Sequence, residues 1–178
     1  MRLIKLITFL ILSVCPTLLK AQAIEWDPNR LLTWKDFKGK TDYQSTHGAV
    51  SYWNITYTYQ CENRDCTYIV IFNLKNLFDT QGSWVKRDAE SDYLLSHEQL
   101  HFDISELFTR KLAAAFHATL FTSNFKAEIE EIYNKIRGEC DAMQSKYDDE
   151  SQHSKNTNMQ YRWDLYVYEQ LKELPRNY

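Results

Sequence analysis

The sequence predicts an α+β fold, in which a small antiparallel sheet packs on one long motif-bearing helix and two further helices. Three observations predict this fold. Two β-rich alternating segments come early in the chain, three segments with helical periodicity follow, and the first helical segment contains no Gly and no Pro. Strands that precede helices, rather than alternate with them, are typical of α+β proteins.

The strands are expected in the first half of the chain. Residues 50–60 alternate aromatic and β-branched residues with polar ones, and residues 67–74 form a second β-rich run. The stretch between them, 62–65, is polar and turn-like, so the two runs are expected to pair as an antiparallel hairpin. A third and shorter strand is expected at residues 83–86.

Two long helices are expected after the strands. Apolar residues recur at helical spacing across residues 88–119, and either Asp88 or Ser91 could cap the start of this helix. A second helix is expected at residues 125–146, with Asn124 as its N-cap.

The last quarter of the chain is expected to hold a loop and one more helix. Residues 147–158 are polar, which predicts a loop. Residues 159–174 carry apolar side chains at helical spacing, and Pro175 is expected to end that helix. Gly138, inside the second helix, weakens it by about 1 kcal/mol relative to Ala.

The first 23 residues have the features of a secretory signal peptide. They combine a positively charged start, an apolar run at 6–14 and an A-x-A cleavage site at 21–23. The apolar run is too short to span a bilayer comfortably. Cys15 offers a lipoprotein signal as the alternative. Cleavage would leave residues 24–178, a suitable length for one domain in a secreted or periplasmic protein.

The charge of the exported part limits its partners. Removing residues 1–23 takes away Arg2, Lys5 and Lys20 and no acid, so the formal net charge falls from −3 to −6. This acidic balance disfavours nucleic acid and anionic membrane surfaces as partners. Stable membrane insertion is not expected once the apolar leader is removed.

Cysteine is sparse in the exported part. Cys61 and Cys66 flank the predicted hairpin turn, so a small disulfide between them is expected in an oxidising compartment. The alternative is a pair of metal ligands, for which a lone C-x4-C spacing is weak support. Cys140 is then left over, as a buried or free thiol.

The most specific local pattern is His97-Glu98-Gln99-Leu100-His101, which fits H-E-x-x-H. On a helix, His97 and His101 share one face because they are four residues apart. Two imidazoles in this arrangement can bind one zinc ion, and Glu98 can accept a proton from a water molecule that zinc activates. The alternative is a chance pentapeptide with two surface histidines.

A catalytic zinc site needs a third protein ligand. The metzincin extension is absent, because Ile104 and Leu107 stand where its Gly and its third His would be. Asp103 lies about 200° around the helix from His101, so it is expected to face away from the metal and to brace the helix or a nearby loop. His117 is roughly 24 Å further along the same helix.

The third ligand is therefore expected from another element. The segment 147–156 holds His153 among three acids, a composition common in metal-binding loops and also in solvated acidic loops. His47 could approach the motif only through the tertiary fold. The competing carboxylates lie in the same loop and on the second helix: Asp148, Glu150, Glu128 and Glu131.

Four segments carry motifs that are more specific than H-E-x-x-H alone. They read L-T-W-K-D-F-K-G at 32–39, S-W-V at 83–85, L-L-S-H-E-Q-L-H-F-D at 94–103 and Y-D-D-E-S-Q-H-S at 147–154. In these segments the chain resembles a secreted bacterial family that is classed as a domain of unknown function and placed among zincin-like metallopeptidases. The family has Thr and Gly where this chain has Ser151 and Ser154.

The resemblance implies a zincin-like active-site helix with Zn²⁺ at His97 and His101, and it raises His153 as the third ligand. We therefore expect an exported zinc-dependent hydrolase that cleaves amide bonds in a peptide or protein substrate. Glu98 is the expected base, and Tyr147 is a candidate oxyanion donor. The alternative is a non-catalytic zincin-fold protein that binds metal or a partner. Glu98 favours the enzyme, because a binding module needs the histidines but not the base.

Overall fold

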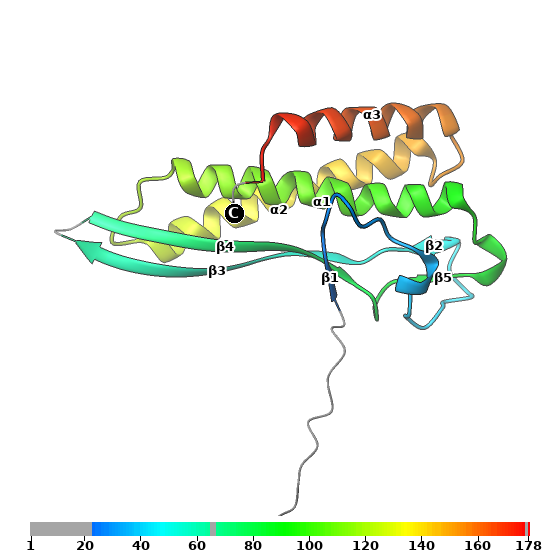
Figure 1. Cartoon of the computed structure of the whole chain (residues 1–178), viewed down its shortest axis with the longest axis horizontal. Helices are drawn as coiled ribbons and strands as arrows, with labels where there is room; N and C mark the ends of the chain where they lie inside the picture. Colours follow the sequence, from blue (N-terminus) through cyan, green and yellow to red (C-terminus); the bar gives the residue numbers. More distant parts are fainter. Residues whose placement is uncertain (1–22, 65–66, 177) are drawn as a thin grey trace, which may run out of the picture.

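The computed structural model describes residues 23–64, 67–176 and 178, and it has the predicted α+β architecture (Figure 1). The first 22 residues of the expected signal peptide lie outside the described residues, as does Cys66 of the expected disulfide. The elements follow in the order β1 Ala23–Glu25, η1 Trp34–Asp36, β2 Ala49–Val50, β3 Trp53–Arg64, β4 Thr67–Asp79, β5 Trp84–Val85, η2 Arg87–Ala89, α1 Asp92–Ala118, α2 Phe125–Ser151 and α3 Thr157–Glu173.

The main sheet is a long antiparallel hairpin with one short strand added. Its strand order is β1-β4-β3, and β3 pairs with β4 from Trp53↔Phe78 to Arg64↔Thr67. The predicted hairpin is confirmed, but both strands run further than their β-rich cores at 50–60 and 67–74. The extra length of β4 is stabilised from both sides, because β1 pairs with the end of β4 as far as Asp79.

A separate two-stranded sheet joins the chain before the hairpin to the chain after it. Ala49 pairs with Val85 and Val50 with Trp84, which confirms the short strand expected at 83–86. Because β5 leads directly into η2 and α1, this pairing holds β2 near the start of α1.

The helices form two layers above the main sheet (Figure 1). α1 and α2 lie next to the sheet, and α3 lies on the outer side of α1. α1 is therefore enclosed by the sheet, α2 and α3, and its apolar residues form much of the core: Leu100, Ile104, Leu107, Phe108, Leu112 and Phe116. The side chain of Ser91 accepts a hydrogen bond from the Leu94 amide, so Ser91 rather than Asp88 caps this helix.

The second helix extends further than its sequence indicates. The prediction of a loop at 147–158 is wrong at both ends, because α2 continues to Ser151 and α3 begins at Thr157. Tyr147 and Ser151 are fully buried against the rest of the fold, and this burial holds a polar turn in the helix. The chain then turns through 152–156 into α3, which Asn156 caps.

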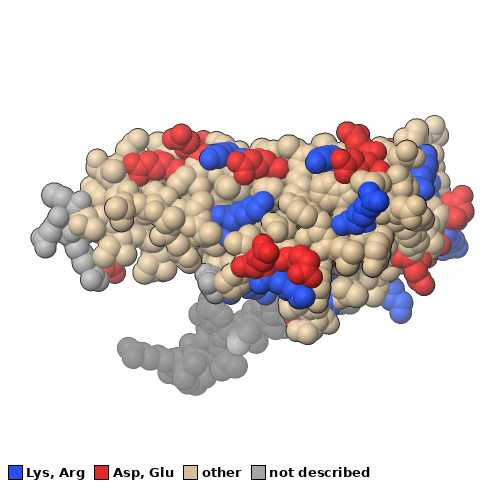
Figure 2. Space-filling model, turned by 90° about the horizontal axis from the view of Figure 1, so that it is seen from above, with Lys and Arg blue, Asp and Glu red and all other residues tan. Residues whose placement is uncertain are grey.

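The surface and the helices give two further observations. Acidic and basic side chains are interspersed on the face that carries α3 (Figure 2). None of the helices in the described part of the chain is long and apolar enough to cross a membrane.

Cys140, the cysteine outside the expected Cys61–Cys66 pair, has a free thiol that is buried in the main core.

Candidate metal centre

The H-E-x-x-H residues lie in the first third of α1, where this helix is enclosed by its neighbours. His97, Glu98 and His101 are 3%, 4% and 8% exposed. Burying two imidazoles and a carboxylate is unfavourable unless each has a polar or ionic partner. The neighbouring elements are therefore expected to supply such partners, and α2 supplies the first.

Asp148, near the end of α2, brings its carboxylate to the two histidines. Its Oδ1 lies 3.2 Å from Nε2 of His97 and 3.1 Å from Nε2 of His101. The two Nε2 atoms lie 3.3 Å apart. Within the described residues, these three side chains form the one group of His, Cys, Asp or Glu that could hold a metal ion.

The electrostatics of this group favour a cation. Burial opposes the charged form of Asp148, but hydrogen bonds and attraction from His101 and His97 hold its pKa well below the usual range. Burial likewise opposes the charged form of His101, yet Asp148 and Glu98 raise its pKa above the ordinary value. The last turn of α2 contains no basic residue, so its partial negative charge adds to that of Asp148.

Gln144, one turn before Asp148 on α2, orients His101. Its Oε1 accepts a hydrogen bond from Nδ1 of His101 at 2.6 Å, and its Nε2 donates to the main-chain carbonyl of His101 at 2.8 Å. With Nδ1 protonated, Nε2 of His101 keeps its lone pair for a metal. Gln144 is a residue of this site that the sequence pattern does not single out. Its i, i+4 spacing to Asp148 is a signal only when α2 is known to reach Asp148.

Tyr147 packs between the histidines and the third helix. Its ring centroid lies 4.7 Å from that of His97 and 4.9 Å from that of His101. Its hydroxyl donates to the main-chain carbonyl of His97 at 3.5 Å, and burial raises its pKa. Tyr147 is fully buried and does not line the cleft described below, so its hydroxyl is not placed as an oxyanion donor.

His153 lies beside this group rather than within it. Its Nδ1 is 3.3 Å from Oδ1 of Asp148, and its side chain is 50% exposed. The backbone reaches this point through three consecutive residues with positive φ, Gln152, His153 and Ser154. His47, from the loop before β2, packs edge-to-face on His153 with ring centroids 5.0 Å apart. The structure thus brings together two histidines that are 106 positions apart in the sequence.

The other candidate ligands lie elsewhere. Glu128 is hydrogen-bonded to Thr122 at the start of α2, about 30 Å along the helix from Asp148. Glu131 is exposed on the same part of α2. Glu150 accepts a hydrogen bond from Nε1 of Trp163 at 2.9 Å. His117 lies near the end of α1, which is continuous from the motif to that point.

A cleft of about 700 Å³ opens over the histidines. Glu98 lines it together with His97, His101 and Asp148, and no described residue forms a hydrogen bond with the Glu98 carboxylate. The opposite wall comes from the loop before β2 and from β2 itself. The remaining lining residues include His47, Gly48, Ala49, Val50, Ser51, Tyr93, Leu94, His153 and Lys155.

The far side of α1 is tied to the start of the described chain. Nε2 of Gln99 donates to Oδ1 of Asp103 at 2.8 Å, and Nε1 of Trp26 donates to the same oxygen at 2.6 Å. Oε1 of Gln99 accepts a hydrogen bond from the Leu32 amide at 2.7 Å. This confirms that Asp103 braces the helix against a neighbouring loop.

The segment 32–39 has a structural role in this brace. Asp36 accepts a hydrogen bond from the Thr33 amide and so closes the η1 turn, while Phe37 is buried in the core below. A Cβ at Gly39 would lie within 2.8 Å of the backbone carbonyl oxygens of residues 81–83, so only Gly fits this contact. The segment therefore fixes α1 on the sheet and contributes no atom to the cleft.

The comparisons with known proteins identify a family but no characterised relative. A family of bacterial proteins of unknown function, DUF922, matches residues 32–154, which include both strands of the hairpin, α1 and α2. No curated protein and no solved structure matches the chain significantly.

Proposed function

Since the chain belongs to the DUF922 family of bacterial proteins, for which no function is known, we propose its activity from the metal centre: an exported zinc-dependent hydrolase that cleaves amide bonds in peptides or proteins. His97, His101 and Asp148 would hold the zinc ion, and Glu98 is the base. The proposal extends the family assignment to a zincin-like metallopeptidase.

The observation that carries the proposal is the convergence of three ligand atoms. Zinc bonds to imidazole nitrogen and carboxylate oxygen are about 2.0–2.1 Å long, so ligands at the corners of a tetrahedron lie about 3.3 Å apart. The three separations in this group are 3.1, 3.2 and 3.3 Å. Three protein ligands leave the fourth corner open, as in catalytic rather than structural zinc sites.

The position of Glu98 supports its role as the base. It follows His97 directly on α1, lines the cleft and has no competing hydrogen bond within the described residues. Bound zinc supplies Lewis acidity, which polarises a carbonyl group and makes water a better nucleophile. Glu98 would accept the proton of the attacking water and deliver it to the departing amine.

His153 fits a role as a donor to the substrate better than a role as a ligand. Its Nδ1 contacts Asp148, while its side chain remains half exposed at the rim of the cleft. An imidazole at this point can donate a hydrogen bond to the negative charge that develops on the scissile carbonyl oxygen. His47 packs on the ring of His153 and limits its rotation.

The direct test compares wild type with Glu98→Gln on a broad peptide library, using the exported part of the chain with zinc. The Gln variant keeps the size of the side chain and removes the base, so zinc content should be unchanged. Hydrolysis should fall by about 10²–10⁴-fold. Glu131→Gln makes the same change at an exposed position of α2 and should behave as wild type. Equal activity in Glu98→Gln and wild type would contradict the assignment of Glu98. Zinc binding without hydrolysis in wild type would instead favour the non-catalytic binding protein.

A further inference from the structure

One ring nitrogen in the metal centre lacks a partner. Nδ1 of His97 is buried and forms no hydrogen bond with any described residue, whereas Nδ1 of His101 is bonded to Gln144. When Nε2 of a histidine binds a metal, Nδ1 carries the proton. The Nδ1–H group then normally donates a hydrogen bond to a carboxylate, a carbonyl or water. The metal site proposed above therefore requires an acceptor for Nδ1 of His97.

The geometry of α1 and α3 brings one carboxylate to this nitrogen. Nε2 of Gln160 on α3 donates to the Tyr93 carbonyl at 3.3 Å and to Oγ of Ser96 at 2.8 Å. The two helices run parallel, since Arg110 of α1 contacts main-chain carbonyls at the end of α3. One turn after Gln160, Asp164 therefore faces the turn of α1 that follows Tyr93.

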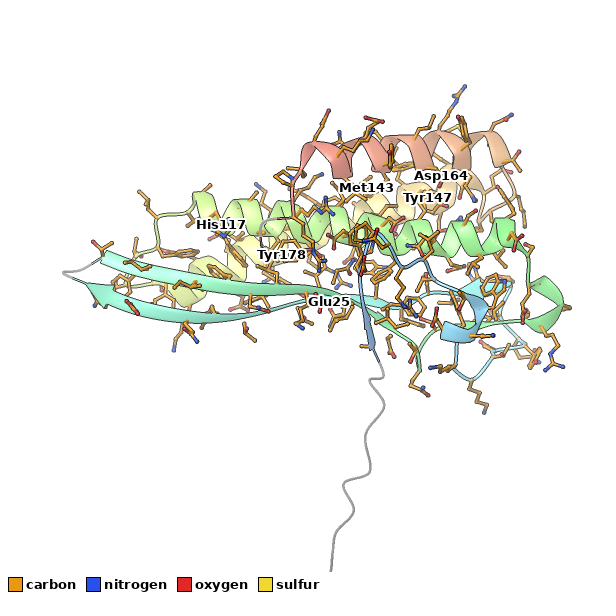
Figure 3. All side chains as sticks on the ribbon, viewed as in Figure 1. Glu25, His117, Met143, Tyr147, Asp164 and Tyr178 are labelled. Carbon is orange, nitrogen blue, oxygen red and sulfur yellow. The ribbon has the colours of Figure 1, made fainter. Side chains whose placement is uncertain are left out.

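Asp164 lies where its charge influences the metal centre. It interacts electrostatically with His97, Tyr93 and Tyr147. Figure 3 shows Asp164 and Tyr147 next to each other, where α3 packs on the inner helices. Burial raises the pKa of Asp164, and attraction to His97 opposes this rise.

Asp164 is a carboxylate with spare hydrogen-bonding capacity. No residue in the described part of the chain donates a hydrogen bond to it. The neighbouring Asp103 is already engaged by Trp26 and Gln99. The hydroxyl of Tyr93 is buried, interacts electrostatically with Asp164 and also has no hydrogen-bond partner among the described residues. Nδ1 of His97, the Asp164 carboxylate and the Tyr93 hydroxyl thus have no hydrogen-bond partner among the described residues, and Asp164 interacts electrostatically with the other two residues.

We propose that Asp164 is the positioning residue for His97: its carboxylate accepts the hydrogen bond of Nδ1–H through one bridging water, which the Tyr93 hydroxyl also contacts. A water bridges the two groups because Nδ1 of His97 forms no direct hydrogen bond with any described residue. Asp164 then orients the imidazole ring of His97, as Gln144 orients the ring of His101. The inference rests on the proposed zinc site and adds a residue from α3, a helix that lies wholly outside the matched family segment.

The test measures zinc affinity by chelator competition in wild type, Asp164→Asn and Asp164→Leu. Leu removes the acceptor and should weaken zinc binding about 10–100-fold, as expected for loss of a partner of a ligand. Asp164→Asn keeps an acceptor oxygen, so its zinc affinity should fall less than that of Asp164→Leu. Asp141→Leu also removes one negative charge, at an exposed position on α2, and should leave the affinity unchanged.

A second readout separates positioning from general stability. In ¹H–¹⁵N spectra of the zinc-loaded protein, the Nδ1–H proton of His97 should exchange slowly with solvent in wild type and faster in Asp164→Leu. Equal zinc affinities and equal exchange in all variants, with zinc bound to wild type, would overturn the role of Asp164 and leave the zinc site intact. Failure of wild type to bind zinc would overturn the proposed function itself, and the role of Asp164 with it.

Discussion

Two hydrogen bonds join Gln144 to His101, one from the imidazole Nδ1 and one to the main-chain carbonyl. The amide of Gln144 therefore fixes both the ring orientation and the tautomer of His101. It also aligns α2 with α1 at the level where Asp148 reaches the histidines. The same residue thus connects the packing of two helices to the arrangement of the metal centre.

Replacement of Gln144 should weaken metal binding while the fold persists. Gln144→Leu has a similar volume but leaves Nδ1–H of His101 without an acceptor, so zinc affinity should fall about 10–100-fold. The exposed side chain of Gln81 forms no hydrogen bond with any described residue, so Gln81→Leu is the control. Chelator competition measures both affinities. An unchanged affinity in Gln144→Leu would show that the Gln144 contact does not orient a ligand.

The same Gly→Ala change should have opposite effects at two positions. At Gly138, in the interior of α2, a Cβ would meet nothing within 4 Å, so Ala should raise the free energy of unfolding by about 1 kcal/mol. At Gly39 the added Cβ would lie 2.7–2.8 Å from three backbone oxygens, so Ala should lower the free energy by about 1–3 kcal/mol. Denaturant titration measures both. Changes of the same sign would contradict the described packing.

The protein should be less stable with serine at position 154 than with glycine there. Its φ is 67°, a left-handed conformation that costs a residue with a side chain about 1–2 kcal/mol. Ser154→Gly should therefore stabilise the protein by about 0.5–1 kcal/mol, part of the gain being offset by the greater freedom of Gly in the unfolded chain. Ser145→Gly, in a helical turn of α2 nearer its C-terminal end, should destabilise the protein by about 0.5 kcal/mol. A loss of stability in Ser154→Gly would contradict the left-handed turn.

Cys140 should be unreactive in the folded protein. It is fully buried, and burial raises the pKa of its thiol to about 12, so almost no thiolate exists at pH values where an ordinary cysteine ionises. In residues 24–178 carrying Cys61→Ser and Cys66→Ser, a thiol reagent should label Cys140 only after unfolding. Labelling of the folded protein should remain slow as the pH rises through the ordinary range near about 8.5. Rapid labelling at that pH would show that the core around Cys140 opens.

The elements with a strong periodic pattern could be predicted from the sequence. The hairpin follows from alternation and α1 from apolar residues at helical spacing, because in both cases local pattern and burial agree. The position of His97 and His101 on one face of α1 follows from their spacing, whereas the burial of that face is seen only in the fold. The bracing role expected for Asp103 follows from its angle around the helix.

The end of α2 and the opposite wall of the cleft could not be predicted. The last turn of α2 is polar, and it is helical because Tyr147 and Ser151 are buried by segments remote in the sequence. With that turn taken as a loop, Gln144 and Asp148 could not be seen to share a helix face. His47 carries no local signal, since only the tertiary fold brings its loop beside His153.

The assignment of Asp148 as the third zinc ligand is tested by the zinc dissociation constants of wild type, Asp148→Ala and His153→Ala. Wild type should bind about one zinc per chain. Asp148→Ala should lose well over 100-fold in affinity, beyond the range of a residue that only supports a ligand. His153→Ala should lose less than about tenfold, because its ring contacts Asp148 without completing the group. Retention of zinc in Asp148→Ala together with its loss in His153→Ala would contradict the account.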